Sequence, residues 1–495
     1  MKKDYLKQLR DGDALTTKQL CILILQLSVP AILAQISSIV MQYIDASMVG
    51  HLGSQEAASI GLMASSTWLF GGLCMASGIG FNVQIAQAIG AKDDVKARQI
   101  VHIGIVVSLI FSSLLLIVGA LISGSLPGWL GGESAIQPEA TAYFFIFSLF
   151  LPIMTLNYVC GGMLQSSGNM KTPAILHIAM CVLDVIFNAF LIFPNWTFEI
   201  MDFSITIEGF GLGVIGAALG TALAECVVVL LMLYFLLIKS PSLHIRHGER
   251  FDSSHRLPIL KKALKIAAPI GFEQFVMCGA QIASTRIVAP LGTAAIAANS
   301  FSITAESLCY MPGYGIGHAA TTLIGQSIGA KRDELTRKIG WLTTALGMGV
   351  MAFTGALMYV FAPEMIALLS PDPEIQALGT TILRIEAFAE PMYAASIVAT
   401  GVFRGAGDTL VPSCMNFVSM WFVRLPLAAL LANSLGLEGV WIAMCIELCC
   451  RGAMFLIRMR GKKWQHSASK SHSGDDTIES QNSDINQSDV GKTEE

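Results

Sequence analysis

The 495-residue sequence is poor in charge: Asp, Glu, Lys and Arg make up 13% of it, against about 25% in soluble domains. Hydrophobic residues make up 54%, and long apolar runs occupy, for example, residues 106–122 and 227–238. A membrane-spanning helix needs about 20 mostly apolar residues. A spanning β-barrel would instead alternate polar and apolar residues in short segments, and no such pattern is present. The composition therefore excludes an ordinary soluble domain and predicts an all-α integral membrane protein.

Several motifs of soluble enzymes and binding modules are missing. No GxxxxGK[ST] sequence is present, which excludes a P-loop nucleotide site. The 11 cysteines form no CxxC or Cys/His metal spacing, and we interpret them as small buried hydrophobes. The nine histidines are scattered, which argues against an enzyme. Residues 1–20 are charged and lack the apolar core of a signal peptide, so we expect them to be retained.

Apolar stretches divide the chain into twelve predicted spans. They lie near residues 21–48, 57–83, 100–124, 138–160, 172–194, 211–238, 262–289, 294–325, 338–361, 376–403, 410–432 and 437–457. Every second connection lacks Lys and Arg, and each of the connections between them contains Lys, Arg or both. Basic loops face the cytoplasm, so both termini are predicted to be cytoplasmic. The acidic, polar tail at 461–495 is predicted to be disordered.

An internal repeat organises these spans. "AQAIGAKDDVKAR" at 86–98 returns 239 positions later as "GQSIGAKRDELTR" at 325–337, and the same register extends over about 140 residues of each half. Six spans per half is an even number, so the halves are parallel, pseudo-symmetric bundles. We expect an N-lobe at 21–238, a cytoplasmic linker at 239–260 and a C-lobe at 261–460. In the repeated phrase, GAK predicts a glycine turn, and Asp94 and Asp333 are expected near the next helix start.

Ionisable residues inside the first bundle are candidates for function, because such groups are costly in a membrane. Asp45 lies well inside the first span; the alternative is a helix-end residue that touches the headgroups. Asp184 and Asn188 share one face of the fifth span, and Thr221 and Glu225 share one face of the sixth. These residues are predicted to line a polar chamber that takes up a proton or a bare cation.

The second bundle carries different acids. Glu273 lies in the seventh span, Glu306 in the eighth, and Glu386 and Glu390 share a face of the tenth. Glu306 is alternatively a hydrogen-bonding residue between helices, and Arg384 is a candidate to neutralise a tenth-span acid. By the repeat, Asp45 corresponds to Ser284 and Asp184 to Val423, so the scaffold is duplicated but its ionisable groups are not.

The combination of motifs resembles the multidrug and toxic compound extrusion (MATE) family. The relevant stretches are "SVPAILAQ" and "DASMVGHLG" in the first span, the two GAK phrases, "MPGYGIGHAATTLIGQSIGAK" and "GVFRGAGDT". The resemblance covers about residues 20–460. It implies two lobes in a V and the export of organic, often cationic compounds in exchange for Na⁺ or H⁺.

The resemblance also implies roles for particular residues. A first-span Asp, a fifth-span Asn-x-x-x-Asp pair and a sixth-span Thr form the N-lobe site of prokaryotic members, which matches Asp45 and Thr221. Here the pair has its types exchanged, as Asp184 and Asn188. Some members use a C-lobe cation site with a seventh-span Glu, matching Glu273, and a tenth-span acid, here placed at Glu386 or Glu390.

These observations predict a secondary active antiporter and not an enzyme. We expect a monomer in the cell inner membrane that handles small organic substrates, with no nucleic-acid partner, no cofactor and no metal beyond a coupling Na⁺. The alternatives are a lipid-linked precursor flippase of the related superfamily, or a membrane-embedded enzyme. Flippases of this kind tend to have extra spans and cationic cavities, whereas this chain has twelve spans and more mid-membrane acids than bases.

Overall fold

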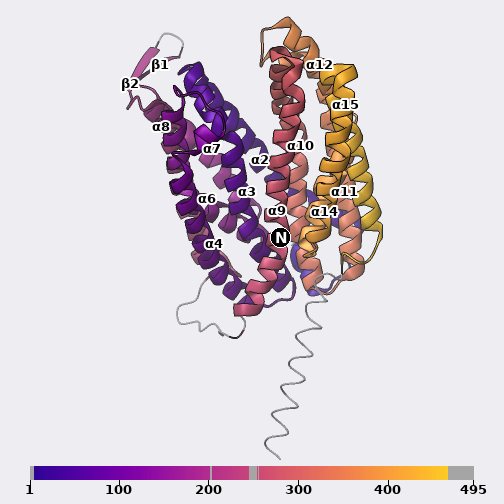
Figure 1. Ribbon diagram of the computed structural model, residues 1–495. Helices are drawn as coiled ribbons and strands as arrows, with labels where there is room; N and C mark the ends of the chain where they lie inside the picture. Colours follow the sequence, from indigo (N-terminus) through magenta and orange to yellow (C-terminus); the bar gives the residue numbers. More distant parts are fainter. Residues whose placement is uncertain (1–4, 201–202, 245–253, 255, 466–495) are drawn as a thin grey trace, which may run out of the picture.

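A computed structural model describes residues 5–200, 203–244, 254 and 256–465. Two helical lobes lie side by side and diverge toward one end, which gives the molecule a V shape (Figure 1). The first lobe and the segment before it comprise α1 (Tyr5–Asp11), α2 (Thr17–Gly50), α3 (Ser54–Gly90), α4 (Asp94–Ile122), α5 (Leu126–Trp129), α6 (Gln137–Ser166), α7 (Lys171–Ile192), β1 (Asn195–Ile200), β2 (Phe203–Glu208) and α8 (Gly213–Tyr234), which continues as a π-helix over Phe235–Lys239. The second comprises α9 (Arg256–Val288), a 3₁₀ turn (Ala289–Leu291), α10 (Thr293–Gly329), α11 (Asp333–Ala367), α12 (Pro373–Glu386), α13 (Glu390–Gly405), α14 (Leu410–Val418), a π-helix (Ser419–Arg424) and α15 (Leu425–Arg460).

The twelve predicted spans are present. Within the described residues, nine helical stretches are long and apolar enough to cross a membrane. The last of them, 410–460, contains two spans, because the helix reverses at Gly436 (φ 60°, ψ −138°). Ser419 in one arm contacts Glu447 in the other, as an antiparallel pair requires. The two remaining spans are α10 and the α12–α13 pair. The predicted fold class is therefore confirmed.

The sequence repeat appears in the structure as a pseudo-twofold arrangement of the lobes. The first span of each half packs against the second span of the other half, as α2 on α10 and α9 on α3. The repeated phrases themselves meet at the closed end of the V. A Cβ on Gly90 would lie 2.1 Å from the carbonyl oxygen of Gln326, and one on Gly329 would lie 2.0 Å from that of Gln87. Each glycine therefore permits the same close crossing of α3 and α10.

This crossing corrects the predicted role of the GAK phrase. We expected its glycine to make the turn, but the left-handed residues are Lys92 (φ 61°) and Lys331 (φ 56°). Gly90 and Gly329 still lie in helices, where the crossing requires their small size. The helix α4, which follows the first GAK phrase, is capped by Asp93 and not by Asp94. The Asp93 side chain accepts a hydrogen bond from the Lys96 amide.

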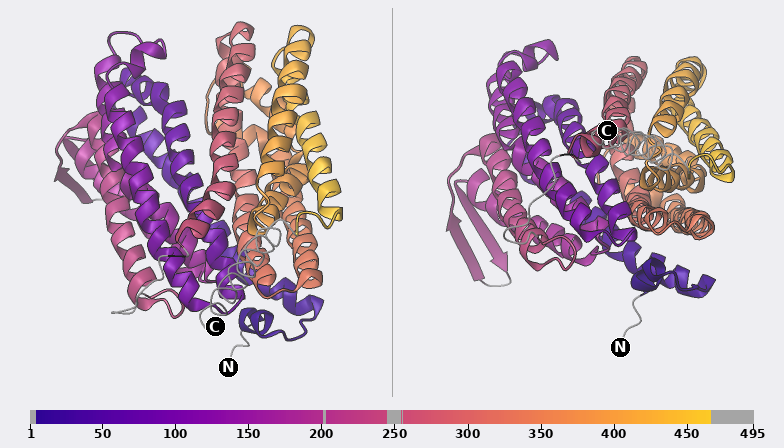
Figure 2. Two further views of the ribbon diagram at one scale, coloured as in Figure 1. Left: turned by 60° about the horizontal axis from the view of Figure 1, so that its bottom comes forward. Right: turned by 90° about the horizontal axis from the view of Figure 1, so that it is seen from below.

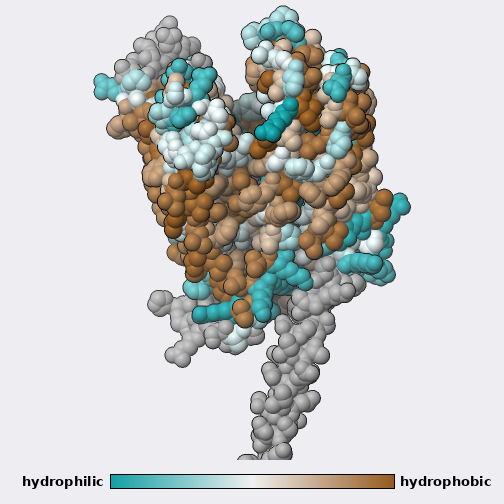
Figure 3. All heavy atoms as spheres, viewed as in Figure 1, coloured by the Kyte–Doolittle hydropathy of each residue, from teal (hydrophilic) through white to brown (hydrophobic). Residues whose placement is uncertain are grey.

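The lobes separate at the other end of the molecule. The space-filling view shows an open cleft there between two surfaces that carry polar side chains, whereas the outer flanks are largely apolar (Figure 3). The helix α1 lies beneath the closed end, on the side where the N-terminus lies (Figure 2). Each lobe has its own buried core, but Leu20 and Ile24 of α2 pack in the core of the C-lobe with Phe403 and Phe455.

One element was not predicted. The connection at 195–210 contains an antiparallel β-hairpin in which Asn195 pairs with Glu208 and Ile200 with Phe203. It projects from the N-lobe at the open end, outside the spans (Figure 1). The predicted disordered tail lies outside the described residues from position 466 onward, as do 245–253 of the predicted linker.

Candidate functional site

The N-lobe brings Asp45, Asp184 and Asn188 together from two helices. The Asn188 amide nitrogen donates to Asp45 Oδ1 (2.9 Å) and to Asp184 Oδ2 (3.1 Å). The Asn188 amide therefore bridges the two carboxyl groups, one from α2 and one from α7. Asp184 and Asn188 are fully buried. Two carboxylates this close repel when both are ionised, so the arrangement requires a shared proton or a bound cation.

The sixth span completes this chamber. The Thr221 hydroxyl donates to the Ala217 carbonyl oxygen, 3.2 Å away. Thr221 directly follows Gly220, which lies against the Asn188 amide, and α8 packs on α7. Glu225, one turn further along α8, is buried.

A glycine that the sequence analysis missed shapes the chamber. A Cβ on Gly220 would lie 2.0 Å from Asn188 Oδ1. This amide oxygen and Asp184 Oδ1 are buried without a hydrogen-bond partner, so both remain available as acceptors in the chamber. Gly220 therefore gives α7 and α8 the close approach that the site needs. Its only sequence signal is its position one residue before Thr221.

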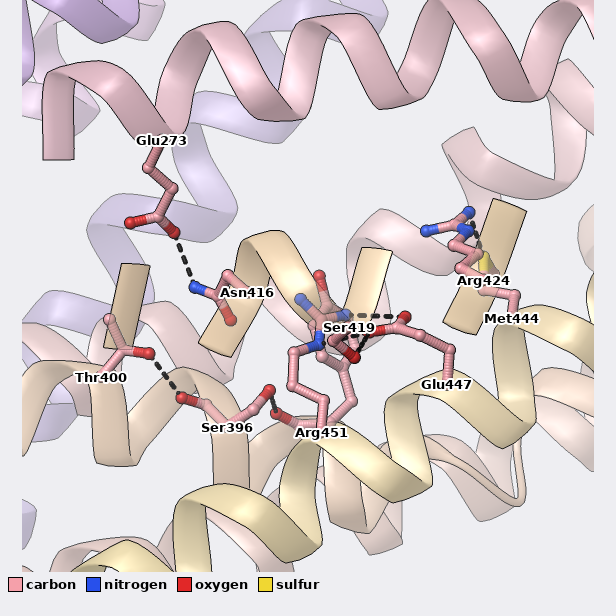
Figure 4. Close-up of polar contacts among 10 residues, drawn as sticks. Glu273, Ser396, Thr400, Asn416, Ser419, Arg424, Met444, Glu447 and Arg451 are labelled. Atoms are coloured by element: carbon pink, nitrogen blue, oxygen red, sulfur yellow. Dashed lines mark hydrogen bonds and ion pairs between the residues drawn. The ribbon is translucent and has the colours of Figure 1, made fainter. Parts of the chain in front are cut away.

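The C-lobe divides its acids between two places. Glu273 of α9 accepts a hydrogen bond from Asn416 Nδ2 of α14 at 2.6 Å (Figure 4). Its other oxygen accepts one from Ser413 Oγ of α14 at 2.7 Å, so both oxygens are paired. The sequence analysis did not name either partner, although their i, i+3 spacing on the eleventh span was readable. This contact holds α9 to α14.

Glu306, Glu386 and Glu390 form a separate buried group. All three are buried, and residues beside them on α10 and α12, namely Ala305, Cys309 and Leu383, pack in one core cluster. Both Glu386 oxygens are buried without a hydrogen-bond partner. The three predicted C-lobe residues thus have different surroundings: Glu273 binds to α14, whereas Glu386 and Glu390 lie on either side of the break between α12 and α13.

A further ionic network lies beside this group. Glu447 of α15 pairs with Arg451, whose Nε lies 3.0 Å from Glu447 Oε1, and accepts a hydrogen bond from Ser419 (Figure 4). The Arg451 guanidinium also stacks over the Tyr393 ring at 5.4 Å. Sequence reasoning missed Glu447, although its i, i+4 spacing to Arg451 is the pattern of a helical ion pair.

The tenth span is broken where its acids lie. The helix α12 ends at Glu386 and α13 begins at Glu390, with three residues of turn between them. Arg384, considered as a partner for these acids, points elsewhere: its Nε donates to the carbonyl oxygen of Tyr359 at 3.3 Å. Discontinuous helices commonly carry the sites of transporters.

Comparison with known proteins agrees with this architecture. A Thermotoga maritima protein named "Probable multidrug resistance protein NorM" is 25% identical over 453 residues, which cover 90% of this chain and 93% of that protein. The Bacillus subtilis "Uncharacterized transporter YisQ" is 24% identical over 387 residues, 78% and 82% of the two chains.

Solved structures share the fold. An outward-facing multidrug resistance MATE family transporter of the MOP superfamily matches with a TM-score of 0.83 at 21% identity, over 93% of this chain and 98% of its own. A Pyrococcus furiosus MOP superfamily transporter, described as having a binding pocket of reverse polarity, matches with the same TM-score at 20% identity, over 94% and 99%.

The MatE family model matches twice, at residues 30–190 and 269–430, once in each lobe. The resemblance noted in the sequence is thereby confirmed. Because the model covers more than half of the chain, in both lobes, this protein belongs to the MatE family of transporters.

Proposed function

We propose that the protein exports organic cations from the cytoplasm in exchange for protons, which bind between Asp45 and Asp184. The observation that carries the proposal is the bridge that the Asn188 amide makes between these two carboxyl groups across α2 and α7, at 2.9 and 3.1 Å. With one proton between them the pair is stable, and without it two charges of the same sign face each other in a buried place. Protonation state thus determines how α2 and α7 pack.

A proton accounts for this geometry better than Na⁺ does. The Asn188 amide presents its N–H group to both carboxyl groups (2.9 and 3.1 Å). A cation in the same position would face this donor, whereas hard cations bind to oxygen. Sodium remains the alternative coupling ion, with Asp184 Oδ1 and Asn188 Oδ1 as further ligands.

The helix α2 supplies a physical route from this site to the lobe interface. Its first half packs in the C-lobe core, and its last turns pack against α7 and α8 in the N-lobe. Two residues before Asp45, the Tyr43 hydroxyl donates to the carbonyl oxygen of Thr304 on α10 at 2.8 Å. A shift of α2 on proton binding therefore changes a contact between lobes. Proton and substrate then weaken each other's binding by the same factor.

Charge polarity favours cationic substrates. The buried acids of the two lobes outnumber the arginines beside them, Arg424 and Arg451. A flippase for anionic lipid-linked precursors would be better served by the opposite polarity. Basic loops at the closed end support cytoplasmic termini and an inner-membrane location, and nothing in the fold requires a second copy. The relatives named above are described as transporters, which supports a function other than catalysis.

Ethidium efflux from proteoliposomes tests the proposal. With an imposed proton gradient we expect efflux from the wild type, and with an imposed sodium gradient at equal pH we expect none. Asp45→Asn should abolish proton-driven efflux while the protein still elutes as a single species. Asp94→Asn removes the same charge from an exposed helix start and should behave as wild type. Efflux driven by sodium alone, or wild-type efflux from Asp45→Asn, would refute proton coupling at this site.

A further inference from the structure

A groove on the outer flank of the C-lobe is unlike the rest of the membrane-facing surface. It has a volume of about 430 Å³ and lies between α11, α12 and α15. It is lined by Tyr359, Thr381, Arg384, Ile385, Phe388, Ile442, Cys445 and Ile446. Figure 1 places α11 and α15 at the edge of the C-lobe away from the N-lobe. Phe388 is 71% exposed and Ile446 41% exposed, so the groove opens toward lipid.

Arg384 gives this apolar groove one positive charge. Its guanidinium stacks over the Tyr359 ring at 5.4 Å, and its Nε donates to the Tyr359 carbonyl oxygen. Among the described residues no carboxylate lies within ion-pair distance of it. Glu386, two positions along, is fully buried on the other side of α12. Arginine side chains near the ends of membrane spans extend toward the headgroups, where lipid phosphates supply an anion.

The depth of the groove suits a lipid headgroup. A helix rises 1.5 Å per residue, so the 35 residues of α11 span about 52 Å, whereas the hydrocarbon core is about 30 Å thick. The helix is therefore longer than the core, and the apolar span predicted from the sequence, 338–361, ends two residues after Tyr359. Tyr359 lies eight residues before the end of α11, or about 12 Å from it. The Arg384 guanidinium beside it thus lies near the boundary between acyl chains and headgroups.

The N-lobe lacks this combination. By the repeat, Arg384 corresponds to Phe145, Tyr359 to Ala120 and Phe388 to Leu149. The equivalent flank therefore carries no charge and no tyrosine at these positions. Apolar residues are sufficient for packing against lipid on either flank, so the presence of Arg384 and Tyr359 on the C-lobe flank needs another explanation.

We propose that this groove is a phospholipid site in the leaflet at the open end of the V. The lipid phosphate binds the Arg384 guanidinium, which forms charge-assisted hydrogen bonds with phosphate oxygens. One acyl chain lies along Phe388, Ile442 and Ile446. The bound lipid fills the space between α11 and α15 and so supports α12 directly above the break in the tenth span.

Native mass spectrometry of the purified full chain tests this site. The protein is incubated with phosphatidylglycerol or with diacylglycerol of the same acyl chains, which lacks the phosphate. We expect the wild type to retain one more phosphatidylglycerol per molecule than Arg384→Gln, and diacylglycerol to be retained equally by both. Arg286→Gln removes the same charge from an exposed position in the last turn of α9 and should retain lipid as the wild type does.

A second variant separates lipid loss from misfolding. Ile446→Trp keeps Arg384 but fills the groove, and it should lose the same phosphatidylglycerol. Both variants should still elute as a single species. Equal retention of phosphatidylglycerol by wild type and both variants would overturn the proposal. The proposal would also be overturned if the wild type retained diacylglycerol as tightly as phosphatidylglycerol. The groove would then be an apolar crevice that does not recognise phosphate.

Discussion

The two lobes are copies of one scaffold, yet their acids lie in different environments. In the N-lobe, the Asn188 amide joins Asp45 and Asp184 between two regular helices. The equivalent positions in the C-lobe are Ser284 and Val423, and its acids instead surround a broken span. Duplication therefore preserves the packing of helices, while single substitutions decide where each lobe carries its buried acids.

The broken span sharpens this comparison. Pro391 follows the break in the C-lobe, and Pro152 occupies the equivalent position in α6, which is continuous. Proline removes a helical hydrogen bond in both halves, so it does not by itself separate the segments. The residues on either side differ: Glu386 and Glu390 in the C-lobe correspond to Phe147 and Leu151. The helix is thus continuous in the N-lobe, where these positions are apolar, and broken in the C-lobe, where they are buried acids.

The largest effect should come from changing a residue that only the N-lobe needs. In Gly220→Ala the new Cβ would overlap Asn188 Oδ1. We expect proton-driven ethidium efflux to fall roughly ten- to hundred-fold, because the amide must move away from the carboxyl pair. Gly61→Ala, where no atom lies within 4 Å of the new Cβ, is the matched control. Unchanged efflux would show that this geometry is not required.

An intermediate effect is expected from substituting the two glycines at the crossing of α3 and α10, and it should be the same in both halves. Gly90→Ala and Gly329→Ala each place a Cβ against a backbone carbonyl of the other lobe. Overpacking of this kind costs about 1–3 kcal/mol, so both variants should open the closed end to a similar extent. Distances between spin labels on the two lobes measure this opening, with Gly124→Ala as a control that meets no neighbour. Clearly unequal responses would contradict the pseudo-twofold crossing.

The smallest effect is expected from losing an ion pair of α1, the helix that contacts both lobes. Arg10 donates to the Gln326 side chain in the C-lobe and to the Ser167 carbonyl in the N-lobe, and Asp11 pairs with Lys92 at 2.6 Å. Lys92 lowers the pKa of Asp11 below its ordinary value of 3.8. The stabilisation is therefore present above pH 3.8 and is lost as pH falls through the lowered pKa.

A spin label at the exposed Ala14 reports on this contact. We expect its mobility to rise slightly below about pH 4 in the wild type. In Lys92→Gln the label should already be more mobile at neutral pH, and its mobility should change less on acidification. The same acid response in both proteins would exclude the ion pair as its cause.

Sequence patterns predicted much of this molecule. Hydropathy located the spans, and charged loops separated them. The 239-residue shift revealed the two halves. The i, i+4 spacing of Asp184 and Asn188 placed them on one face of a helix, and they do act together. The β-hairpin was missed, because the hydropathy pattern was read for helical spans only. Glu447 was missed although its ion-pair spacing was present.

Other features had no sequence signal that distinguished them. Glu273 and Glu390 are both buried acids of the C-lobe, but only the first finds partners, in Ser413 and Asn416. Arg384 and Glu386 are two residues apart, and one reaches the membrane while the other is buried in the bundle. In each case the environment depends on how a helix is rotated and on which neighbour faces it.

By itself, the sequence determined the membrane class, the twelve spans, the doubled scaffold and the list of costly buried acids, because hydrophobicity and helical periodicity are properties of the chain alone. Only the tertiary structure decided that Asp45 meets Asp184, that Glu273 stands apart from Glu386, and that Gly90 and Gly329 allow the lobes to cross. Those outcomes depend on contacts between helices far apart in sequence, and periodicity fixes the face of a helix without fixing its partner.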